Sequence, residues 1–223
     1  MKLAFVSVFL LVLIVIAGVF LWNRRKETVS FVPAPSPAAT LEEKLADLAA
    51  CGIALRPGVS ADDLLSSWDR ADYEEPGYEL LLTGIGMAGE APPYEYRSDM
   101  LWHFDPECIA DEGSYVAVAR RLSEIAGGSL PLANLRDHVD LEEGEAWLAF
   151  ECQGREYKIP CKVEDDWVDP AIFRHFVALL EATDPGKIFI YYDLGGQDCI
   201  IGCLPKALYD DLKRLIPKVE PLS

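Results

Sequence analysis

The longest apolar run in the chain extends from Leu3 to Trp22, and Ser7 is its only polar side chain. A helix rises about 1.5 Å per residue, so a run of this length spans the hydrocarbon core of a bilayer. A cleaved signal peptide is the alternative, but it needs a shorter apolar core and a small-residue cleavage site close behind. We therefore predict a single N-terminal transmembrane helix, within a membrane anchor over residues 1–26 that contacts the lipid bilayer.

The cations beside this run bear on its orientation. Lys2 precedes it, whereas Arg24, Arg25 and Lys26 follow it. Because cytoplasmic flanks carry the excess of Lys and Arg, this distribution favours a single-pass membrane protein whose C-terminal domain is cytoplasmic, although the opposite orientation stays open. Residues 27–39 are rich in Pro and Ala and predict an extended linker. We expect residues 40–223 to form one globular domain.

Within this domain, several segments show apolar residues at the 3.6-residue spacing of an amphipathic helix. Thr40 and Glu43 form a capping-box pattern at the start of the first. Asp169 followed by Pro170 is typical of the start of another. The clearest predicted helix covers residues 114–125. Others begin after Thr40 and end near Gly52, begin at Pro170 and end before Pro185, and begin near Pro205 and include Leu215.

Two pairs of apolar segments predict β-hairpins. Residues 146–152 and 156–163 are joined through Gln153 and Gly154, and residues 187–194 and 199–204 are joined through a glycine-rich turn. The second pair is apolar almost throughout, which is typical of strands at the centre of a sheet. We predict an α+β fold in which an antiparallel sheet contains both C-terminal hairpins and the helices pack mainly on one face.

Other segments are less regular. Residues 99–105 predict a further strand, whereas residues 78–83 fit either a strand or a helical turn. Gly84, Gly86 and Gly89 match the G-x-G-x-x-G pattern of dinucleotide sites, which requires a helix to begin at the glycines. Pro92 and Pro93 follow too closely for a regular helix. We therefore predict a glycine-rich turn and no cofactor.

Charge distribution adds a constraint on partners. All 37 acidic residues follow position 26, as do 16 of the 20 basic residues, and the formal net charge of the chain is −17. An acidic surface repels phosphate backbones, which argues against nucleic acid as a partner, and it attracts basic proteins. The alternative is that the acidity only keeps the domain soluble.

The six cysteines permit three disulfides by number, but most lie in apolar runs. We expect buried free thiols that behave as small core residues.

Two H-x-D pairs are candidates for chemistry. They are His103 with Asp105 and His138 with Asp140. Residues two apart in a strand share a face, so each pair could hold a metal ion or exchange a proton with a substrate. No H-E-x-x-H or C-x-x-C motif completes a zinc site. Ordinary hydrogen-bonded histidines are the competing interpretation, and no metal is predicted.

Trp102 and an acidic loop that contains Asp165, Asp166 and Trp167 are candidates for contact with a partner protein. An exposed tryptophan in an acidic rim can anchor an interface, whereas a tryptophan in a strand more often packs in the core.

These observations favour a membrane-anchored acidic protein-binding module without catalysis. A membrane-tethered metal-dependent hydrolase that uses His103, Asp105, His138 and Asp140 is one alternative. The acidic α/β composition also resembles that of toxin-neutralising immunity proteins, which implies a basic toxin as a possible partner.

Overall fold

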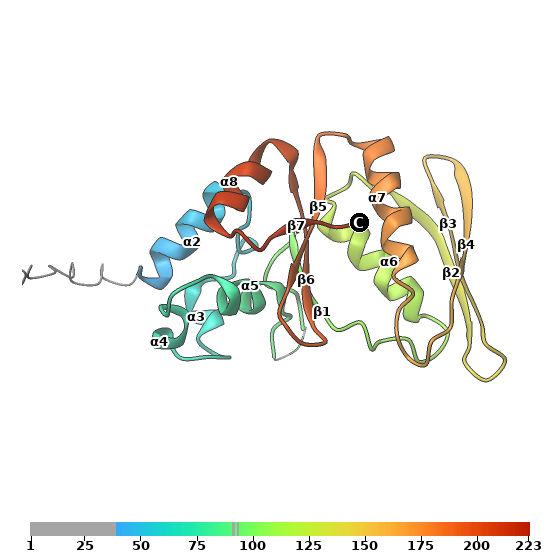
Figure 1. The fold of residues 1–223 in the computed structure, drawn as a ribbon, viewed down its shortest axis with the longest axis horizontal. Helices are drawn as coiled ribbons and strands as arrows, with labels where there is room; N and C mark the ends of the chain where they lie inside the picture. The colour runs from blue at the N-terminus through green and yellow to red at the C-terminus, as the bar shows by residue number, and fades with distance from the viewer. Residues whose placement is uncertain (1–38, 91, 93) are drawn as a thin grey trace, which may run out of the picture. The chain divides into compact units, whose positions relative to one another are not determined.

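A four-stranded antiparallel sheet lies at the centre of the domain (Figure 1). The structure is a computed structural model and describes residues 39–90, 92 and 94–223; the predicted anchor over Leu3–Trp22 and most of the linker lie outside these residues. The described residues group into one compact unit. The strand order is β1–β6–β5–β7, with bounds Leu101–Phe104, Cys199–Pro205, Lys187–Asp193 and Glu220–Pro221.

Both faces of this sheet are buried. Phe104, Phe189 and Ile201 face one core, which is shared with α6 and α7, whereas Leu101 and Ile200 face a second core. Strands β5 and β6 carry apolar side chains on both faces, so other elements must pack against each face to exclude water. Helices α6 (Ser114–Ile125) and α7 (Ala171–Thr183) lie on the first face, and α2 (Leu41–Ala50), α5 (Glu79–Gly86) and α8 (Tyr209–Leu215) lie on the second (Figure 1).

A second antiparallel sheet packs on the far side of α6 and α7. Its strand order is β2–β3–β4, with bounds Leu132–Asp140, Glu145–Cys152 and Arg155–Cys161. Leu148, Phe150 and Ile159 point inward and join the first core. The domain is therefore layered as helices, sheet, helices and sheet. The short helices α3 (Ala61–Leu64) and α4 (Arg70–Tyr73) and the 3-10 turn η1 (Lys206–Leu208) complete the chain.

The α+β class, the antiparallel pairing and both hairpins are confirmed. Two finer predictions differ from the structure. The hairpins lie in separate sheets, and helices cover both faces of the four-stranded sheet. The physical reason is the same for both: β3 and β4 bury only one face, whereas β6 is buried along both, so the hairpins need different surroundings.

Residues 78–83 belong to α5, and Gly84 and Gly86 are inside this helix rather than in a turn. The glycines allow α5 to approach its neighbours closely. A Cβ built on Gly86 would lie 2.7 Å from the backbone nitrogen of His103 and 3.1 Å from the carbonyl carbon of Trp102. Gly86 therefore sets the distance between α5 and β1. No helix within residues 39–223, apart from the two undescribed positions 91 and 93, has the length and apolar character needed to cross a bilayer.

All six cysteines lie in the described residues and are free thiols. Cys108 is partly exposed, and the other five are buried, as expected from their apolar surroundings. Burial raises the pKa of Cys199 and of Cys203 to about 12, so neither thiol is activated as a nucleophile at neutral pH.

Gly86→Ala should destabilise the protein by about 1–3 kcal/mol, because the added methyl group meets backbone that cannot rotate away. Urea unfolding of the full-length protein measures this loss. Gly89→Ala is the matched control, since its Cβ meets only the carbonyl oxygen of Glu95, at 3.7 Å. If the two variants had the same free energy of unfolding, α5 and β1 would be able to move apart without loss of stability.

Candidate functional site

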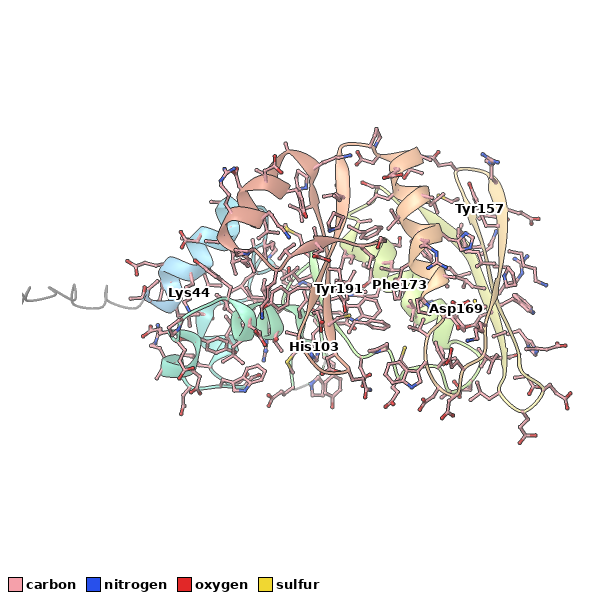
Figure 2. The ribbon with its side chains drawn as sticks, viewed as in Figure 1. Lys44, His103, Tyr157, Asp169, Phe173 and Tyr191 are labelled. Atoms are coloured by element: carbon pink, nitrogen blue, oxygen red, sulfur yellow. The ribbon has the colours of Figure 1, made fainter. Side chains whose placement is uncertain are left out.

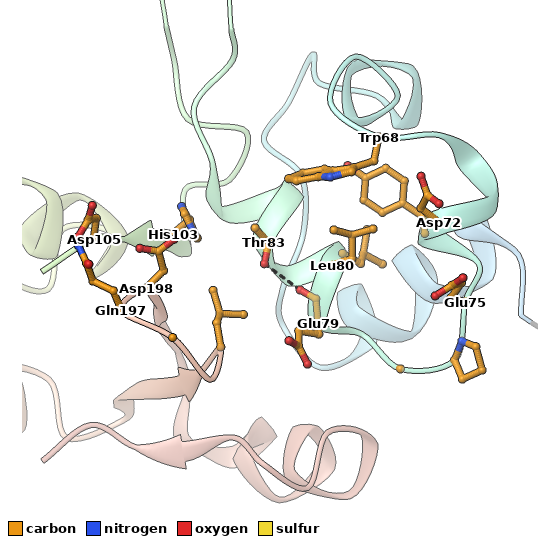
Figure 3. Close-up of a pocket in the computed structure, with 16 residues that line it drawn as sticks. Trp68, Asp72, Glu75, Glu79, Leu80, Thr83, His103, Asp105, Gln197 and Asp198 are labelled. Atoms are coloured by element: carbon orange, nitrogen blue, oxygen red, sulfur yellow. Dashed lines mark hydrogen bonds and ion pairs between the residues drawn. The ribbon is translucent and has the colours of Figure 1, made fainter.

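A cavity of about 970 Å³ lies beside the face of the four-stranded sheet that carries α5 (Figure 3). We call it the acidic groove. One wall is formed by α4, α5 and the loop between them, and the other by the end of β1 and the β5–β6 turn. Its polar and aromatic lining residues are Trp68, Asp72, Tyr73, Glu75, Glu79, Thr83, His103, Asp105, Gln197 and Asp198.

The first wall depends on a buried lysine. Lys44, on α2 (Figure 2), is 4 % exposed, and its Nζ donates to the backbone oxygens of Tyr73 at 2.7 Å and Gly77 at 2.8 Å, and also to that of Glu75. The ammonium group thus satisfies three carbonyls at the end of α4 and in the loop that follows it. Burial lowers the pKa of Lys44, while nearby Glu74 and Glu75 oppose this shift. The lysine binds only the backbone of this segment, and the Glu75 carboxylate remains exposed and lines the groove.

The second wall brings together residues that are far apart in sequence. Strand β1 pairs with β6, so His103 lies opposite Ile200 and close to the turn before it. The Nε2 atom of His103 is 3.2 Å from Oδ2 of Asp198. On the same wall, Oδ1 of Asp105 accepts a hydrogen bond of 2.6 Å from Gln197. Figure 3 shows these side chains on the opposite side of the groove from Asp72, Glu75 and Glu79.

Negative charge is concentrated in the acidic groove. Its lining contains five carboxylates and no Lys or Arg. Within the described part of the chain, none of the five forms an ion pair with a lysine or arginine; Asp198 pairs only with His103. Two cations near this groove, Lys44 and Arg97, are instead buried and bind backbone and hydroxyl oxygens. The groove therefore has a negative potential that only an external cation would neutralise.

Glu79 also contributes to the floor of the groove. Its Oε2 accepts a hydrogen bond of 3.1 Å from the hydroxyl of Tyr192 on β5. Burial, followed by the bond to Glu79, raises the pKa of Tyr192, so this tyrosine stays protonated and continues to donate at neutral pH. Apolar Leu80 and Leu194 lie between the charged positions, and Trp68 packs edge to face on Tyr73 at 6.0 Å.

The two predicted H-x-D pairs do not share a site. His103 is on β1 and Asp105 directly follows this strand, and both line the acidic groove, whereas His138 and Asp140 are on β2 in the other sheet. His103 pairs with Asp198, and Nδ1 of His138 is 3.3 Å from Oε1 of Glu112. Within the described residues, no group of three or more His, Cys, Asp or Glu side chains is arranged to hold a metal ion.

The other predicted partner-binding residues lie away from this groove. Trp102 is 8 % exposed and packs against Phe104 with 4.2 Å between ring centroids, so little of its surface is available. Trp167 is 39 % exposed and, with Asp165, lines a smaller cavity of about 420 Å³; Asp166 accepts the backbone N–H of Ile109 through its carbonyl. A partner contact at these residues stays a prediction.

Sequence reasoning did not identify Asp72, Glu75 and Glu79 as site residues. They belong to a charged segment and to the short apolar segment of residues 78–83 after it. The backbone that carries Asp72 and Glu75 is bound by Lys44, which lies about thirty positions earlier in the chain. No local pattern contains that information.

Comparison with known proteins gives no further guide to this site. No protein-family model matches the chain, and neither the curated proteins nor the solved structures contain a significant match.

Lys44→Met should lower the free energy of unfolding by about 3 kcal/mol, because three carbonyls lose their donor in a buried place. Urea unfolding of the full-length protein provides the measurement. Lys206→Met, at an exposed position, is the control and should change stability by less than about 0.5 kcal/mol. An unchanged midpoint for Lys44→Met would show that the loop holds its shape without the ammonium group.

Alkaline pH should destabilise the protein through Tyr73. This side chain is 1 % exposed and donates to the carbonyl oxygen of Leu64, and burial raises its pKa from 10.0 to about 12. Below pH 10 the folded and unfolded states are both protonated. Between pH 10 and 12 the unfolded state loses the proton first, so stability falls by up to about 1.4 kcal/mol per pH unit for this group.

Unfolding at several pH values from 8 to 11 tests this expectation. Tyr73→Phe should show a shallower decline above pH 10, although it loses the bond to Leu64 at every pH. A decline of equal steepness would assign the alkaline sensitivity to other groups, such as Tyr78, whose pKa is also raised to about 12.

Proposed function

We propose that this chain is a membrane-tethered, non-catalytic module that binds a basic segment of a partner protein in the acidic groove. The tether is the predicted anchor over Leu3–Trp22. The observation that carries the proposal is a cavity of about 970 Å³ with five carboxylates and no lining Lys or Arg. A partner with Lys or Arg side chains would relieve the repulsion among these carboxylates and would be steered toward the groove by its charge.

The shape of the lining favours a peptide-like segment over a lone cation. Carboxylates on the two walls alternate with Leu80, Leu194 and the face of Trp68. Long basic side chains have aliphatic stems that pack on such apolar surface while the charged end reaches a carboxylate. Neutralisation of a basic toxin, as in immunity proteins, is one role that this mode of binding would serve.

A hydrolase is the competing function, and the His103–Asp198 pair is the observation that favours it. A carboxylate beside an imidazole can orient it as a general base. His138 and Asp140 lie on the other sheet, so the hydrolase hypothesis rests here on His103 and Asp198. Catalysis would require His103 to activate water against a substrate bound in the acidic groove.

Neutralising the acidic groove should weaken binding of a basic peptide. The probe is a fluorescein-labelled peptide, acetyl-Arg-Leu-Lys-Leu-Arg, titrated with full-length protein in neutral detergent and followed by fluorescence anisotropy. The triple variant Asp72→Asn, Glu75→Gln, Asp198→Asn should bind about tenfold more weakly, and the wild-type association rate should fall as NaCl increases.

The matched control removes the same three charges elsewhere, at the exposed β2–β3 turn, by Glu142→Gln, Glu143→Gln and Glu145→Gln. This control should bind within about twofold of wild type. Equal weakening by both triple variants, or no dependence on salt, would contradict recognition by the groove. Mass spectrometry of the peptide after incubation should find it intact; cleavage that is lost in His103→Asn would favour the hydrolase.

A further inference from the structure

The outer face of the three-stranded sheet has a different character from the rest of the surface. In the β2–β3–β4 register, Ala149 lies between Arg136 and Lys158, and Trp147 lies between His138 and Pro160. These residues alternate with the inward-facing core residues, so they share the face turned away from α6 and α7. We call the four residues Arg136, His138, Trp147 and Lys158 the basic face.

Trp147 is the centre of the basic face. The His138 ring stacks on the indole with 6.0 Å between centroids and 29° between planes. The Nζ atom of Lys158 lies 4.1 Å from the centre of the indole ring, within cation–π range. The indole is partly exposed and held by both neighbours, which makes it a rigid platform beside two cations.

The two side chains of the basic face that are always cationic lack carboxylate partners, whereas Nδ1 of His138 lies 3.3 Å from Oε1 of Glu112. Arg136 and Lys158 are both exposed, and within the described residues neither forms an ion pair with a carboxylate. The guanidinium of Arg136 has only a long contact of 3.5 Å to the carbonyl oxygen of Asn134. With 37 acidic residues available in the chain, two unpaired cations on either side of Ala149 leave a positive site open to an external anion.

The neighbouring positions limit the size of that anion. Asp140 is opposite Glu145 at one end of the face, and Glu151 is opposite Glu156 at the other. These two acidic rows would repel a long polyanion such as nucleic acid. Between them there is room for a short anionic stretch whose carboxylates meet the cations and whose apolar residue packs on the indole.

We propose that the basic face binds a short acidic segment of a second partner protein, independently of the acidic groove. Arg136 and Lys158 hold its carboxylates, and Trp147 packs against its aromatic or aliphatic side chain. Charge complementarity supports this occupant. In Figure 1, β2–β4 lie at the end of the domain opposite α2–α4, so a partner on this face would not compete with one in the groove.

Anisotropy of fluorescein-labelled acetyl-Glu-Glu-Phe-Glu-Glu, titrated with full-length protein in neutral detergent, tests the proposal. Arg136→Gln with Lys158→Gln should weaken binding about tenfold, and Trp147→Leu should weaken it severalfold without changing the charge. The glutamine analogue acetyl-Gln-Gln-Phe-Gln-Gln should not bind measurably.

Lys206→Gln with Lys218→Gln is the control, since it removes two exposed cations from another surface. It should leave the affinity within about twofold. If both double variants weakened peptide binding equally, the proposal would be overturned, because the affinity would then depend on the net charge of the protein and not on the basic face. Tighter binding of a twelve-nucleotide oligothymidine than of the acidic peptide, lost in the double variant Arg136→Gln, Lys158→Gln, would overturn the proposal in favour of nucleic acid. Self-association of the protein at low salt that is lost in the same variant would overturn it in favour of a second copy of the chain.

Discussion

Burial of the β5–β6 hairpin on both faces is the constraint on which the rest of the structure depends. Every residue of β6 from Cys199 to Leu204 is buried, and Gly202 leaves no space for a side chain, because a Cβ there would lie 2.7 Å from Leu101 and 2.9 Å from Ile190. Such a strand must be covered from both sides. The two helical layers supply this cover, and the acidic groove is the space that remains where α4 and α5 extend past the end of β1.

Placement of the cations follows from the same architecture. Some buried carbonyl groups in helices and strands need an additional donor, and Lys44, Arg97 and Arg121 supply it from buried positions. Arg121 also lies 3.6 Å from the centre of the Tyr96 ring. Because these charges are used internally, the surface is more acidic than composition alone suggests, and the basic face contrasts sharply with it.

Local patterns in the sequence predicted the elements better than their assembly. The capping box at Thr40, the apolar spacing over residues 114–125 and the two hairpin turns each depend on near neighbours, and each prediction is confirmed. Helix α5 was uncertain because residues 78–83 are too few to distinguish a strand from a helical turn. Its glycines were predicted to form a turn, but Gly86 instead lets the helix contact β1. His103 was identified by its type, but its partner Asp198 is set by the β1–β6 register, which no short spacing encodes.

The turn between β5 and β6 has two structural roles, and each constrains different residues. It closes the most deeply buried hairpin, yet Leu194, Gln197 and Asp198 are also part of the groove wall. A Cβ at Gly196 would meet nothing within 4 Å, so the tip tolerates new side chains without disturbing the sheet. Substitutions at Gly196 would therefore change the chemistry of the groove wall without loss of the fold, so related chains can differ there at little cost in stability.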